Sequence, residues 1–148
     1  MEAMAAASGG AGPPPSLTVM DSGLDAFLRA HAGANALPAA LYAGGERLWE
    51  ELRAAPPAGP AWGRFLVAMG ETAAERLGDD RAAAQWFRRC LDAEAVHRDA
   101  EACVAAGLGQ GVLWERAGDP ARALPAYRAA AAEGFRCGVL RPATLRAA

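Results

Sequence analysis

Residues 111–130 have the sequence GVLWERAGDPARALPAYRAA, and this stretch decides the fold. Gly118 can end one helix, Asp119 can cap the next, and Pro120 suits a first helical turn. A second Gly-Asp turn lies 40 residues earlier, at positions 78–79. Behind each turn the chain repeats an alanine and, four residues on, an aromatic residue. A helix–turn–helix unit that recurs at such an interval predicts a helical solenoid.

The rest of the chain extends this all-α prediction. Apolar residues recur at helical spacing, and no segment alternates as a strand does. Residues 56–60, PPAGP, form a linker that a helix cannot cross. Ser22 and Asp25 have the form of a capping box, so the first helix should begin at Ser22. We expect five to seven helices, over residues 22–33, 37–53, 61–77, 80–94, 97–117 and 120–133.

Composition divides the chain into a leader, a domain and a tail. Residues 1–20 are rich in Ala, Gly and Pro and are predicted to be a disordered leader. Residues 21–140 should form the helical domain, with a tail over 141–148. The leader lacks the features of secretory and mitochondrial signals, and no apolar run is long enough to span a membrane. We therefore expect a cytoplasmic protein.

The charges and cysteines argue against several classes of partner. The net charge is −2, and all 15 basic residues are arginines scattered along the chain, so nucleic-acid or membrane-surface binding is not expected. The three cysteines form no Cys-x2-Cys pair, and no metal site or cofactor is predicted. Cys90 and Cys103 should be buried, and Cys137 should be exposed.

The second helix pair resembles a tetratricopeptide repeat. Gly111 and Trp114 match the small and aromatic residues of that family's first helix. Ala123, Tyr127 and Ala130 match the small–aromatic–small pattern of its second helix. The resemblance implies a short right-handed stack of antiparallel helix pairs, a tetratricopeptide-like α-solenoid.

The first pair matches the family less well. Ala83, Phe87 and Cys90 follow its Gly-Asp turn as expected, but the first helix departs from the pattern. The 40-residue period exceeds the family's 34, and we expect residues 92–100 to absorb the difference as added helix. Gly107, one turn before Gly111, should form with it a notch for a large side chain of the next helix.

By position, the resemblance puts a partner-binding groove on the first helix of each pair. Its floor would be apolar, with Glu and Arg at the rim, which suits an amphipathic helix or an extended apolar segment. The family's carboxylate clamp uses Lys and Asn, and is not expected because this chain has no Lys and its single Asn lies outside the repeats. An ordinary packing role for the apolar members remains open. The predicted groove residues are Phe65, Ala68, Thr72, Glu75, Arg76, Ala105, Leu108, Val112, Glu115 and Arg116.

The predicted function is therefore an adaptor or assembly factor that binds another protein. Two good repeats make a short stack, which favours completion by a partner or by a second copy. A self-assembling subunit is the main alternative, with Trp49, Trp62 and Trp86 as interface aromatics. A third possibility is an accessory regulatory subunit of an enzyme or nucleic-acid machine encoded elsewhere.

Catalysis finds little support in the sequence. The two histidines, His31 and His97, have no partner at a spacing typical of a nucleophile and its base. His97 lies between charged residues and is predicted to be a solvated helix start. No phosphate-binding loop and no dinucleotide motif after a strand is present, so no enzymatic activity is expected.

Overall fold

A computed structural model describes residues 15–33 and 36–138, with side chains from residue 23 onward. This part of the chain is all-α and has no strand, as predicted. Positions 1–14, 34–35 and 139–148 lie outside it, and with them the rest of the predicted leader, Asn35 and the predicted tail. The elements are α2 (Pro15–Ala32), α3 (Pro38–Leu52), α4 (Pro60–Glu71), the π-helix η1 (Thr72–Arg76), α5 (Asp80–Asp92), α6 (Glu94–His97), α7 (Ala100–Arg116) and α8 (Pro120–Arg136).

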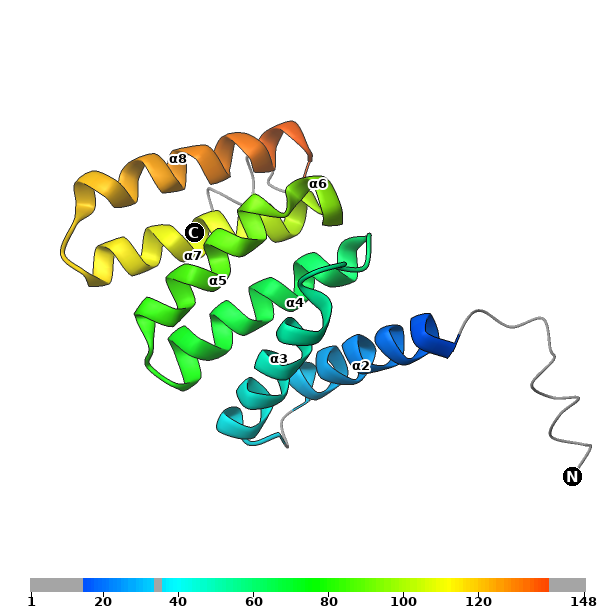
Figure 1. Cartoon of the computed structure of the whole chain (residues 1–148). Helices are drawn as coiled ribbons and strands as arrows, with labels where there is room; N and C mark the ends of the chain where they lie inside the picture. The colour runs from blue at the N-terminus through cyan, green and yellow to red at the C-terminus, as the bar shows by residue number, and fades with distance from the viewer. Residues whose placement is uncertain (1–14, 34–35, 139–148) are drawn as a thin grey trace, which may run out of the picture.

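The long helices lie beside one another in chain order (Figure 1). α4 contacts α2, α5 and α7, and α7 contacts α4, α5 and α8. Helices α4 and α5 form one hairpin, and α7 and α8 form another; each hairpin turns at one of the two Gly-Asp pairs. α2 and α3 lie at the opposite end from α8. α4 and α7 are therefore the central elements, because each is covered on several sides.

Both Gly-Asp turns have the predicted conformation. Gly78 and Gly118 adopt φ values of 66° and 76°, which favour glycine. The Asp79 carboxylate accepts a hydrogen bond from the Ala82 N–H at 3.0 Å, and Asp119 caps α8 in the same way. Each turn thus closes one helix and opens the next with a side-chain cap.

Glycines let large side chains reach the backbones of neighbouring helices. A Cβ at Gly70 would lie 2.5 Å from the Phe87 ring, and a Cβ at Gly109 would lie 2.6 Å from it. Phe87 of α5 is therefore held between the backbones of α4 and α7. The notch predicted in α7 is confirmed at Gly111, where the Tyr127 ring leaves no room for a Cβ, whereas Gly107 faces the small Ala130 and no large side chain.

Two helix boundaries differ from the prediction. α2 begins at Pro15 rather than Ser22, so residues 15–20 are helical and not part of a leader. The expected helix over 97–117 is divided, because Arg98 takes a left-handed conformation, with φ 48°, after the short helix α6. Asp99 then caps α7. Residues 92–100 therefore hold the one-turn helix α6 and the left-handed Arg98, and they do not lengthen α5 or α7 as was expected.

The last turn after α4 is a π-helix, which the sequence did not indicate. The Leu77 N–H donates to the Thr72 carbonyl, five residues back, at 3.1 Å. The buried Thr72 hydroxyl donates to the Ala68 carbonyl at 2.8 Å. The wider turn places one more residue before Gly78 than an α-helix would, and it changes which side chains face α7.

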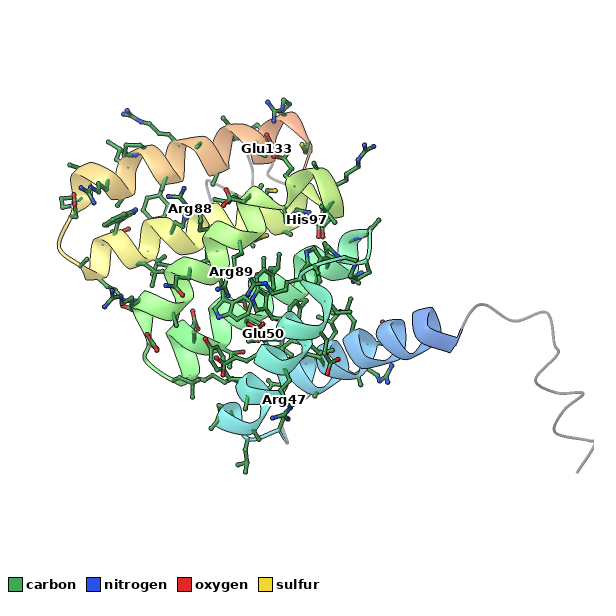
Figure 2. All side chains as sticks on the ribbon, in the orientation of Figure 1. Arg47, Glu50, Arg88, Arg89, His97 and Glu133 are labelled. Atoms are coloured by element: carbon green, nitrogen blue, oxygen red, sulfur yellow. The ribbon has the colours of Figure 1, made fainter. Side chains whose placement is uncertain are left out.

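The three tryptophans predicted as interface residues belong to the core. Trp62 and Trp86 are only 2 % and 3 % exposed. Trp49 is half-buried and stacks on Trp62, with ring centroids 5.8 Å apart. The Arg89 guanidinium, labelled in Figure 2, lies 4.5 Å from the Trp49 ring and 4.4 Å from Trp86. This aromatic cluster joins α3, α4 and α5 and leaves Trp62 and Trp86 unavailable to a partner.

The adjacent glycines of α3 should respond oppositely to alanine. Gly45→Ala would drive a Cβ into the buried side chain of Met69 and to 2.8 Å from the Phe27 ring. We expect it to lower the free energy of unfolding by about 1–3 kcal/mol, measured by urea denaturation. Gly44→Ala meets nothing closer than the Arg47 guanidinium at 3.8 Å and should raise that free energy by up to about 1 kcal/mol. Equal effects of the two substitutions would contradict this packing.

Candidate functional site: the seam between α4 and α7

An open groove follows the line where α4 and η1 face α7, and we call it the seam. A hollow of about 410 Å³ lies at its α2 end, and another of about 220 Å³ lies at its η1 end. Glu71 and Ala105 line both hollows, so the two lie next to each other along the same walls. The seam is thus formed by helices α2, α4 and α7 together with η1.

The α7 wall of the seam contains most of the residues predicted for it. Ala105, Leu108, Val112 and Arg116 all line the η1-end hollow. Leu108 and Val112 are 36 % and 39 % exposed, which is unusual for large apolar side chains on a central helix. Glu115 instead points to α8, where the Tyr127 hydroxyl donates a hydrogen bond to its carboxylate.

The α4 wall differs from the prediction. Phe65 and Thr72 are 0 % and 1 % exposed, so they belong to the core and not to a groove. The reason is α2, whose Phe27 packs against the Phe65 ring with centroids 5.0 Å apart. Ala68 and Glu75 do line the seam, whereas Arg76 lines neither hollow. The wall also includes four residues that the sequence analysis missed: Arg64, Val67, Glu71 and Ala74.

Acidic groups dominate the middle of the seam. Partial burial raises the pKa of the Glu71 carboxyl. The nearby His31 opposes this rise, and the negative charge of Glu75 adds slightly to it. Arg116 is paired with the Asp80 carboxylate at 2.9 Å, so its charge is already matched. Arg64 adds one positive charge at the α2 end, but the carboxylates Glu71, Glu75, Asp99 and Glu101 outnumber it along the seam.

A third hollow, of about 290 Å³, lies between α5 and α7. Arg88, labelled in Figure 2, and Trp114 line it. Leu113 lines both this hollow and the η1 end of the seam, so α7 alone separates the two. Its one carboxylate, Asp80, is paired with Arg116, so this hollow lacks an unpaired acidic group of the kind that Glu71 gives the seam.

Cys90 and His97 form a buried pair that sequence reasoning missed. His97 is 0 % exposed and not solvated as predicted. Its Nδ1 accepts the Asp99 N–H at 3.0 Å, so Nε2 carries the proton and donates to the Cys90 carbonyl at 2.8 Å. The Cys90 Sγ lies 3.7 Å from that Nε2. The left-handed Arg98 turns the imidazole inward, and no local sequence signal indicates that turn.

This pair is arranged for packing, although a thiol beside an imidazole resembles a nucleophile and its base. Burial, with smaller effects of Cys103 and Asp99, raises the pKa of the Cys90 thiol to about 12, so the thiol is protonated at neutral pH. The Cys90 thiol also donates to the Ala102 carbonyl. Neither Cys90 nor His97 lines a hollow described above. The pair therefore links α5 and α6 to α7.

Comparison with known proteins adds no relative. No family model, no curated protein and no solved structure matches the chain. The resemblance to tetratricopeptide repeats therefore stays a prediction. Within the described ranges, no helix has the length and apolar character that a membrane span requires, and no three potential metal ligands are grouped.

The burial of the thiols predicts their reactivity. In the folded protein at pH 8, Ellman's reagent should modify Cys137 rapidly and should leave Cys90 and Cys103 unmodified, because both are buried with thiol pKa values raised to about 12 and about 11. All 3 cysteines should react in guanidinium chloride. Cys137→Ser is the control and should remove the rapid phase. A second rapid thiol in the native protein would contradict the described core.

Proposed function

We propose that this chain is a protein–protein interaction module that binds a segment of another protein along the seam. The observation that supports this most is the pair of adjacent hollows between α4 and α7, beside which Leu108 and Val112 are left partly exposed. Apolar grooves of this kind take up amphipathic helices or extended segments. In this proposal the hairpins form a short tetratricopeptide-like stack, and the seam is its groove.

The size of the seam limits the segment that fits. From Glu101 to Arg116 the α7 wall extends for about 22 Å. This length accommodates about seven residues of extended chain, or an amphipathic helix of about four turns. Ala68, Ala74 and Ala105 have small side chains, so the bound backbone would approach the helices closely. Large apolar side chains of the segment would lie against Leu108 and Val112.

The charge of the seam favours a segment that carries a basic residue. Among the residues that the structure describes, Glu71 has no ion-pair partner. Partial burial weakens its contact with water, so a lysine or arginine from a partner would gain a charge-assisted bond there. Glu75 would add to this attraction at the η1 end.

Three free cysteines fit a reducing compartment, and we place this activity in the cytoplasm.

The proposal is tested by selecting peptides from a random display library on the full chain and measuring their affinities by calorimetry. Leu108→Arg puts a charge on the floor of the seam and should weaken the selected peptides at least about tenfold. Leu124→Arg is the matched control, because Leu124 is 50 % exposed on α8 and lines none of the hollows described here. Circular dichroism would show that both variants fold.

The charge preference has its own readout in the same experiment. Glu71→Gln should weaken the peptides that contain Lys or Arg and leave neutral peptides unchanged. Selected peptides that bind wild type and Leu108→Arg equally would contradict the seam as the binding site. A selection that yields no binder specific to the folded chain would count against an interaction module altogether.

A further inference from the structure

The first two helices carry an apolar surface that no other helix covers. A hollow of about 490 Å³ lies between α2 and α3, and we call its surroundings the α2–α3 face. Glycine, alanine, leucine and phenylalanine side chains alone line it, and no described residue of α4, α5, α7 or α8 does. Its lining includes Ala26, Ala30, Leu37, Ala40, Gly44 and Leu48.

We infer that a second copy of this chain docks on the α2–α3 face through a two-fold axis. Such an axis brings the same patch of both copies together, so the patch must be complementary to itself. Shape, glycine placement and charge on this face each meet that requirement.

The face carries both a projecting side chain and a hollow to receive it. Leu37, just before α3, is 73 % exposed, the largest exposure among the large apolar side chains of the described chain. The hollow beside it has room for a side chain because Ala26, Ala30 and Ala40 are small. A two-fold axis would place Leu37 of each copy in the hollow of the other, which buries both exposed leucines.

Gly44 has no role within its own chain that explains its small size. Its neighbour Gly45 is required, because a Cβ there would overlap Met69. A Cβ at Gly44 would meet only the tip of Arg47, an exposed residue labelled in Figure 2, at 3.8 Å. Glycine inside a helix is unfavourable unless something approaches closely. The missing Cβ at Gly44 therefore leaves room for a helix from outside the chain.

The absence of charge permits two copies to meet at this face. A charged residue near a two-fold axis meets its own like charge in the other copy, which is unfavourable. Because the hollow has no charged lining residue among those described, two copies meet without such a cost. Arg47 lies at the edge, where it can stay in water.

The size of the face predicts a weak dimer. α3 has 15 residues, so two adjacent helices present roughly 450 Å² in projection. Stable complexes bury about 800 Å² of accessible surface on each partner. The dimer should therefore dissociate in the micromolar range and depend on concentration.

Sedimentation equilibrium of the full chain, from about 5 to about 500 µM, tests this directly. The average mass should rise from that of one chain towards that of two. Gly44→Glu should raise the dissociation constant at least tenfold while preserving the fold, because the position is open and glutamate favours a helix. Leu37→Glu should act in the same way. Leu124→Glu, on the distant α8, is the matched control and should leave the dimer unchanged.

Three results would overturn the inference. A single-chain mass over the whole range would mean that something other than a second copy covers this face, such as residues 1–14 or a different protein. A dimer that survives both Gly44→Glu and Leu37→Glu would form elsewhere. A dimer lost in Leu124→Glu would involve α8. None of these results bears on peptide binding in the seam, which has its own test.

Discussion

Phe87 of α5 lies with its ring against the backbones of two other helices, at Gly70 of α4 and Gly109 of α7. Neither position has room for a Cβ, so the ring fixes how closely the three helices approach. Phe87 also lines the η1 end of the seam, next to Leu108 and Val112. This contact therefore helps to set the width of the seam, together with Gly63 of α4, where a Cβ would lie 3.0 Å from the Ala102 Cβ of α7. Gly45 and Gly111 receive Met69 and Tyr127 in the same manner, so close approach at glycine is the rule that organises the whole domain.

Sequence reasoning succeeded where the signal is local. Glycine at a left-handed position and aspartate at a helix start identify both hairpin turns, and the spacing of Gly107 and Gly111 predicts a notch. It failed where the cause is distant in sequence. The left-handed Arg98 and the π-turn after α4 have no local marker in the sequence.

The candidate site shows the same division. Four of the five residues expected on the α7 wall line the seam, since α7 is one uninterrupted helix from Ala100 to Arg116 and residues at helical spacing share a face. The α4 wall does not agree, because α2 covers Phe65 and no repeat pattern places α2 there. The tryptophans likewise look like surface anchors in the sequence, but Trp62 and Trp86 are buried by contacts among α3, α4 and α5.

A double-mutant cycle between Gly70→Ala and Phe87→Leu would test most directly whether the packing of the helices depends on close contacts at glycine. If the Phe87 ring is what excludes a Cβ at position 70, alanine there should cost much less free energy of unfolding in the Phe87→Leu background. The expected coupling is at least about 1 kcal/mol, measured by urea denaturation. Additive effects within error would contradict the account, because they would mean that Phe87 and Gly70 do not constrain each other.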